Sequence, residues 1–140
     1  VLNFHFSYDI EVLNPNCQIV DNSLSLVNYA RNPLGNITIE EMVEDISGAL
    51  IGTKEVFARY NPTTGFGETQ FEDELQFDPQ SSLHIEKWIT LDCSNCSGLG
   101  IDLIEFEQRF SQVPEPTILA LMGLGLTGIG YRRHLSKIAA

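Results

Sequence analysis

The sequence predicts an all-β protein: a small antiparallel β-sandwich followed by a single C-terminal hydrophobic helix. Two observations predict the sandwich. Apolar and polar residues alternate in short runs, and turn-forming residues separate these runs at fairly regular intervals. A third observation predicts the helix, because the chain closes with an uncharged apolar run followed by basic residues. At 140 residues the chain has the usual size of one domain, which we divide into a body, residues 1–112, and a C-terminal segment, residues 113–140.

Alternation predicts the strands. It begins at once, since Leu2, Phe4, Phe6 and Tyr8 are separated by polar residues. In the last expected strand, one face carries the apolar residues Ile104, Phe106 and Phe110. The clearest strands are residues 2–12, 18–29, 83–91 and 101–110. The turn signals between runs are Asn14-Pro15-Asn16, Asn32-Pro33 with Gly35, Asn61-Pro62 with Gly65 and Gly67, Asp78-Pro79, and residues 94–100.

One segment of the body fits two patterns. Over residues 38–46 the apolar side chains follow helical spacing, and Thr38 with Glu41 matches a capping box. The same residues also fit a strand whose partner returns after Ser47-Gly48. We favour the hairpin, because the neighbouring segments are β-like.

The charge distribution excludes one class of partner. The chain has 8 Lys and Arg against 19 Asp and Glu, and three of the basic residues (Arg132, Arg133 and Lys137) lie in the last ten positions. The body is therefore strongly acidic. Nucleic-acid binding depends on cations that neutralise phosphates, so we expect no nucleic-acid partner. An acidic body fits a solvated extracellular surface.

The start of the chain gives a second indication of an exported protein. The first residue is Val1, and the alternating pattern starts immediately, without a basic region followed by an apolar one. We expect an upstream signal peptide that was removed, or a longer precursor.

Three blocks follow one another at the C-terminus. Pro114-Glu115-Pro116 comes first, an uncharged apolar run from Thr117 to Tyr131 comes second, and Arg132-Arg133 comes third. As a helix of about 1.5 Å rise per residue the run would reach about 22 Å, against a hydrocarbon core of about 30 Å. It is a marginal span, which snorkelling arginines and local thinning of the bilayer would help. The basic end favours the cytoplasmic side, which places the body on the opposite side.

This arrangement resembles the PEP-CTERM sorting signal on exported proteins of Gram-negative bacteria. The matching residues are Val113-Pro114-Glu115-Pro116, the Leu- and Gly-rich run 119–130, and Arg132-Arg133; the tail then continues to Ala140, where many members stop sooner. The resemblance implies an inner membrane-anchored precursor and a partner, the exosortase. This membrane protease reads the Pro-Glu-Pro motif and removes the tail. It also implies a final place at the cell surface or outside the cell, and an association with exopolysaccharide and biofilm.

The cysteines and histidines of the body are the first candidates for chemistry. Cys93 and Cys96 have the spacing of a metal knuckle or a redox pair, but a second ligand pair for zinc is absent from the sequence. In an exported chain they could form a local disulfide, leaving Cys17 unpaired; two free thiols are the alternative. His5 and His84 are isolated in strand-like runs, so we expect neither to bind a metal.

The carboxylates of the body are the second group of candidates for chemistry. They gather at Glu40-Glu41-Glu44-Asp45 and over residues 68–78, and such runs usually mark solvated faces. Glycosidase chemistry would need two carboxylates at a fixed separation, which clustering does not provide. Calcium is a minor alternative with Asp92, Asn95 and Asp102 as oxygen ligands, although the spacing is not that of an EF-hand. We expect no other cofactor.

The sequence therefore predicts a non-catalytic exported protein of the cell surface or extracellular matrix, and no enzyme. A carbohydrate-binding module of the same architecture is the alternative, and a secreted hydrolase comes third. The module would need an exposed aromatic platform, for which Tyr29, Tyr60, Phe66 and Trp88 are the candidates.

Overall fold

The computed structural model describes residues 1–94, 96 and 100–114. This part of the chain consists of strands and turns and contains no helix. Its strands are β1 (Leu2–Glu11), β2 (Cys17–Arg31), β3 (Asn36–Asp45), β4 (Leu50–Asn61), β5 (Phe66–Gln70), β6 (Glu72–Gln80), β7 (Ser82–Asp92) and β8 (Ile101–Pro114). The all-β prediction is confirmed for these residues. The expected C-terminal helix lies outside them.

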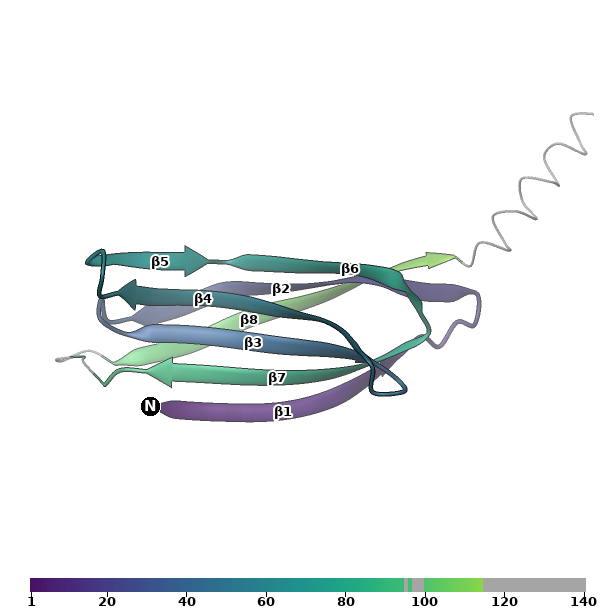
Figure 1. The fold of residues 1–140 in the computed structure, drawn as a ribbon, viewed down its shortest axis with the longest axis horizontal. Coiled ribbons are helices and arrows are strands. Elements are labelled where there is room, and N and C mark those ends of the chain that lie inside the picture. The colour runs from purple at the N-terminus through teal and green to yellow at the C-terminus, as the bar shows by residue number, and fades with distance from the viewer. Residues whose placement is uncertain (95, 97–99, 115–140) are drawn as a thin grey trace, which may run out of the picture.

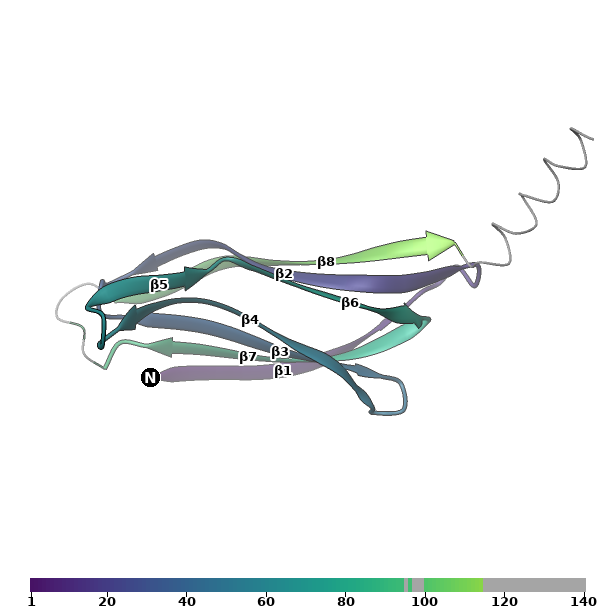
Figure 2. The same cartoon turned by 45° about the horizontal axis from the view of Figure 1, so that its top comes forward.

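Two antiparallel sheets form the molecule. One has five strands in the order β1-β7-β3-β4-β5, and the other has three in the order β6-β2-β8. The sheets lie in two layers, as the two views in Figures 1 and 2 show. One of the connections between the layers is Phe71, between β5 and β6, whose carbonyl accepts a hydrogen bond from the Leu26 N–H. This is the expected sandwich-like architecture.

Alternation of side chains explains why these segments are strands. On β3 the residues Ile37, Ile39 and Val43 point inward and are fully buried, as is Glu41 in the same row, while the alternate residues are more exposed. On β7 the inward row contains Leu83, Ile85 and Ile89. Both strands lie inside the five-stranded sheet, so one face meets the other sheet and the opposite face meets solvent.

The core between the sheets is divided into two hydrophobic clusters. The first consists of Leu24, Leu26, Ile37, Ile39, Val56, Ala58 and Ile89. The second consists of Ile19, Val43, Leu83 and Ile85. Three strands contribute to both clusters, and on each of them a buried polar residue stands between the two: Asn22 on β2, Glu41 on β3 and Lys87 on β7.

The ambiguous segment is a β-hairpin, as favoured. β3 and β4 pair in antiparallel register, with Ile39 opposite Val56. The turn depends on Gly48, whose φ of 81° lies in the left-handed region that glycine adopts without strain. The Asp45 carboxylate accepts hydrogen bonds from the N–H groups of Ser47 (2.8 Å) and Ala49 (2.9 Å), and with the Ser47 hydroxyl these bonds lower its pKa. Thr38 and Glu41 are therefore strand residues, not a helix cap.

Two local expectations are wrong. Ile104 is 62% exposed and does not share the inner face with Phe106, because the pairing of β8 with β2 shifts register between Leu26 and Tyr29 and turns Ile104 outward. Asp78-Pro79 lies within β6 and makes no turn. Proline is tolerated there because β6 is the edge strand of its sheet.

A matched pair of substitutions tests the register of β8. We expect Ile39→Ala to lower the free energy of unfolding by about 2–5 kcal/mol, because it leaves a cavity in the core. Ile104→Ala should change it by about 0.5 kcal/mol or less, because the side chain is largely solvated. Urea unfolding followed by fluorescence of Trp88, the single tryptophan, measures both. Equal losses would show that Ile104 faces the core after all.

Candidate functional site

The C-terminal strand leads directly into the predicted sorting motif. β8 pairs with β2 up to its last residue, so that Val113 lies opposite Gln18 and Pro114 lies opposite Cys17. Pro114 and Val113 are exposed. The structure thus fixes the first residue of the Pro-Glu-Pro motif at the end of a paired strand, two residues beyond the boundary at 112 drawn from the sequence. The other predicted residues of this segment, Glu115, Pro116, Thr117, Tyr131, Arg132 and Arg133, lie outside the described residues.

Residues 112–133 match the model of the PEP-CTERM protein-sorting motif. The chain carries a PEP-CTERM sorting signal. This match implies an exported protein that is sorted via the membrane to the cell surface and processed by an exosortase, a membrane protease. It covers the tail alone and leaves the body unassigned. No curated protein and no solved structure matches the chain.

The apolar run that follows the PEP-CTERM motif was predicted to be a membrane span. Residues 117–131 lie outside the described part of the chain. Within that part, no helix has the length and hydropathy to cross a bilayer.

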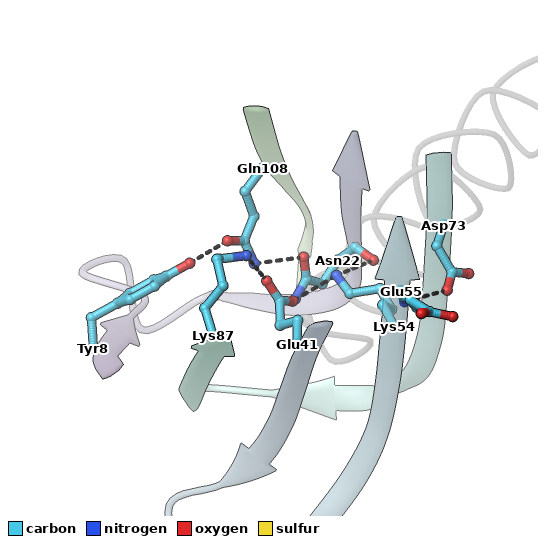
Figure 3. A network of polar contacts seen from close by, with 8 residues as sticks. All are labelled: Tyr8, Asn22, Glu41, Lys54, Glu55, Asp73, Lys87 and Gln108. Carbon is cyan, nitrogen blue, oxygen red and sulfur yellow. Dashed lines mark hydrogen bonds and ion pairs between the residues drawn. The ribbon is translucent and has the colours of Figure 1, made fainter. Parts of the chain in front are cut away.

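A buried polar network lies in the body between the two hydrophobic clusters (Figure 3). Its centre is Glu41 on β3, which is paired in register with Lys54 on β4 on one side and Lys87 on β7 on the other. Lys54 Nζ is 2.8 Å from Glu41 Oε1, and Lys87 Nζ donates to Glu41 Oε2. All three side chains are almost entirely buried. Buried charges are costly unless they are paired, and here one carboxylate serves two ammonium groups.

The second sheet supplies the amide groups of this network. Asn22 on β2 donates from Nδ2 to Glu41 Oε1 at 2.7 Å, and its backbone carbonyl accepts from Lys54 Nζ at 3.1 Å. Gln108 on β8 donates from Nε2 to Asn22 Oδ1 at 3.0 Å and accepts from the Tyr8 hydroxyl of β1. Lys87 Nζ also lies 5.3 Å from the centre of the Phe106 ring. The network therefore connects the two sheets, and among the described side chains no buried polar atom lacks a partner.

Burial shifts the protonation of this network. It lowers the pKa of the Lys54 and Lys87 ammonium groups, while the Glu41 carboxylate acts in the opposite direction. Burial also raises the pKa of Tyr8 well above its usual range, and the charge of Glu41 adds to this effect. The amines are thus brought closer to their neutral, nucleophilic form.

Sequence reasoning missed this network. Glu41 was assigned to a solvated acidic cluster, while Lys54, Lys87, Asn22 and Gln108 were not singled out. A signal was present: Glu41 lies two residues from both Ile39 and Val43, and Lys87 has the same relation to Ile85 and Ile89. In a strand this spacing puts the charged residue on the apolar face.

Asp92 is the last residue of β7 and Cys93 follows it directly, whereas Asp102 lies on β8, opposite Ala30. Cys93 and Cys96 form a disulfide with Cα atoms 5.0 Å apart, and Cys17 is free. The Asp92 carboxylate accepts from the Ser94 N–H at 2.9 Å and from its hydroxyl, which lowers the pKa of Asp92. Asn95 lies outside the described residues, and the described residues contain no group of three or more metal-binding side chains.

The histidines and aromatic candidates are distributed over several strands. His5 stacks on Trp88 with ring centres 4.9 Å apart, and His84 Nδ1 is 2.6 Å from Asp9 Oδ1, a contact that raises the pKa of His84. Tyr29 packs against the first core cluster, whereas Phe66 is largely exposed. Tyr60, on β4, pairs with Gly67.

The remaining acidic residues of the predicted clusters lie in exposed or half-buried positions. The second cluster follows β5 and β6 with its side chains exposed or half-buried, and Asp73 there accepts from the Glu55 N–H at 2.9 Å. Glu40 is exposed, and Glu44 is half-buried. Glu41 is therefore the only carboxylate of the two predicted clusters that the described structure buries.

Glu41 and its neighbour Glu40 give a matched test of the network. Glu41→Gln should lower the free energy of unfolding by about 3–5 kcal/mol, because buried ammonium charge loses its counter-charge. Glu40→Gln, on the exposed face of the same strand, should change it by about 0.5 kcal/mol or less. Urea denaturation at neutral pH compares them. Similar midpoints for both variants would mean that Glu41 does not carry a buried charge.

Tyr8 makes stability depend on alkaline pH. Its pKa is raised in the folded state, so its contribution is complete below the unfolded value of 10.0 and is lost as the pH rises towards the folded value. We expect Tyr8→Phe to reduce the loss of stability between about pH 9 and 11. The lysines titrate in both proteins, so their effect cancels. Parallel pH profiles of the urea midpoint would contradict this assignment.

Proposed function

We propose that this chain is a non-catalytic protein of the cell surface or extracellular matrix whose tail is removed at Pro114-Glu115-Pro116. The precursor is anchored in the inner membrane, an exosortase processes it, and the body then remains at the surface or is released. The observation that carries the proposal is the match of residues 112–133 to the PEP-CTERM protein-sorting motif. Association with exopolysaccharide and biofilm, and an upstream signal peptide, belong to this proposal as properties implied by the resemblance.

The position of the motif in the fold supports processing at this point. The pairing of β8 with β2 and all members of the two core clusters lie at or before Pro114. A cut after the motif would therefore leave every strand and core side chain of the described residues in the body.

The exterior of the body also fits an extracellular setting. Both lysines of the body are buried. Two of its three arginines pair with carboxylates at the surface: Arg59 with Glu55 and Glu68, and Arg109 with Glu107. The surface is thus dominated by carboxylates and repels other polyanions, which supports a solvated surface role and no nucleic-acid partner.

Carbohydrate binding is the second candidate for the body. Aromatic rings are the usual contact for sugar faces, and the stacked pair of His5 and Trp88 together with the exposed Phe66 favour this alternative. These groups lie on β1, β7 and β5 of the five-stranded sheet. The surface-protein proposal does not depend on them.

Substitution of the motif tests the proposal. In the native host we expect the normal chain to lose the residues beyond the motif and to leave the inner membrane. The variant Pro114→Ala/Glu115→Ala/Pro116→Ala should stay full-length in the inner membrane, because the protease no longer recognises it. Intact mass and cell fractionation measure both properties.

A matched control carries substitutions just upstream of the motif. Glu107→Ala/Arg109→Ala removes an exposed ion pair from β8 and leaves the motif intact, so it should be processed like the normal chain. If the motif variant is also processed normally, or if the unsubstituted chain keeps Ala140 and stays soluble, the sorting proposal is wrong.

A further inference from the structure

The contacts of Glu41 bring together the parts of a chemical reaction. One oxygen, Oε1, lies 2.8 Å from the amine nitrogen of Lys54 and 2.7 Å from the amide nitrogen of Asn22. The two nitrogens belong to opposite sheets, with Lys54 on β4 and Asn22 on β2. An amine, a primary amide and a carboxylate that contacts both thus share one buried site.

The side chains of the site are buried in the core. Asn22, Glu41, Lys54 and Lys87 are each at most 3% exposed. Burial lowers the pKa of the Lys54 ammonium group, so its neutral amine is more accessible than in water. The absence of solvent from such a site disfavours hydrolysis of any product formed there.

The charge balance of the site is incomplete as it stands. Two buried lysines contact one buried carboxylate, so full ionisation leaves one excess positive charge in the core. If one lysine becomes part of a neutral amide, the other forms a balanced pair with Glu41. These are also the only two lysines of the body, so the chain places lysine in this domain only at this site.

We infer that Lys54 and Asn22 condense into an intramolecular isopeptide bond, with Glu41 as the group that moves the proton. The neutral Nζ of Lys54 attacks Cγ of Asn22, a bond forms between them, and the electron pair of the carbonyl moves to Oδ1. Glu41 Oε1 takes a proton from Nζ and passes it to Nδ2. The Cγ–Nδ2 bond then breaks, the carbonyl reforms, and ammonia leaves. An amine and a primary amide thus give a secondary amide and ammonia, and neither an oxidant nor a reductant is needed.

Gln108 supplies a hydrogen-bond donor for the oxygen that becomes negative in the reaction. Its Nε2 donates to Asn22 Oδ1 at 3.0 Å, which is the oxygen that becomes negative during the attack. A fixed donor at this position stabilises the tetrahedral intermediate in a site of low dielectric. The amide of Gln108 is held in this orientation by the Tyr8 hydroxyl, which donates to its Oε1 (Figure 3).

The contacts distinguish Lys54 from Lys87 as the nucleophile. Lys54 Nζ shares Oε1 with Asn22 and also donates to the backbone carbonyl of Asn22 at 3.1 Å. Lys87 contacts the other oxygen, Oε2. Lys87 is therefore the cation that remains paired with Glu41 after the reaction. The new bond would join β2 to β4 and so connect the two sheets covalently.

Peptide masses of the full chain, expressed without an exosortase and digested with trypsin after reduction, test the inference. We expect residues 1–31 to be joined to residues 32–59, uncut at Lys54 and lighter than the summed peptides by one molecule of ammonia. This result does not depend on processing of the tail, so it can fail or succeed independently of the sorting proposal. Peptide 32–54 at its sequence mass would overturn the inference, and so would residues 1–31 joined to residues 60–109 through Lys87.

Three variants assign the roles. Lys54→Met should abolish the linked peptide, whereas Glu40→Gln, on the exposed face of β3, should retain it. Glu41→Gln should abolish it, because the amide cannot carry the proton. Circular dichroism confirms the sheet content of each variant. A linked peptide that persists in folded Lys54→Met or Glu41→Gln protein would contradict the proposed chemistry, and the unsubstituted chain decides the proposal even if a variant does not fold.

Discussion

The buried carboxylate of Glu41 is the constraint on which the rest of the body depends. It stands opposite Lys54 on one neighbouring strand and Lys87 on the other, and all three are buried. Removing two ammonium groups and a carboxylate from water costs more than an apolar core of the same volume would. The arrangement is tolerated because each group finds a partner at short range and because Asn22 and Gln108 satisfy the remaining positions from the other sheet.

This constraint specifies how the strands align. Hydrophobic residues along β3 and β7 are similar enough that a slip of two residues would still place apolar side chains inward. Such a slip would move Glu41 away from both lysines and leave charges unpaired in the core, which costs several kcal/mol. The same reasoning applies between the sheets, since Asn22 must lie over Glu41 for its amide to be satisfied. The two hydrophobic clusters supply the driving force, and the polar layer between them selects one register.

Features that depend on residues close together in the sequence could be predicted, whereas features that depend on residues far apart could not. The sorting motif could be predicted because its three blocks are contiguous. The hairpin of β3 and β4 could be predicted because Ser47-Gly48 marks its turn. The bulge that exposes Ile104 could not be predicted, because it depends on how β8 pairs with a strand about 75 positions away in the sequence. Glu41 was assigned to the surface for the same reason: its partners Asn22 and Lys87 are 19 and 46 positions away, and a local window shows only its charge.

A protein that works outside the cell must stay folded without repair, and the covalent ties of this chain differ in what they can contribute. The disulfide between Cys93 and Cys96 spans a sequence separation of 3 and lies at one end of β7. In the chain-entropy account, closing so short a loop contributes only about 2 kcal/mol and joins no separate elements, whereas a link across about 30 residues contributes about 4 kcal/mol. The contact of Lys54 with Asn22 spans 32 residues and crosses from one sheet to the other. Stability of the sandwich against opening therefore rests on the polar layer around Glu41 and on the clusters beside it. This position explains why both lysines of an otherwise acidic body are inside it.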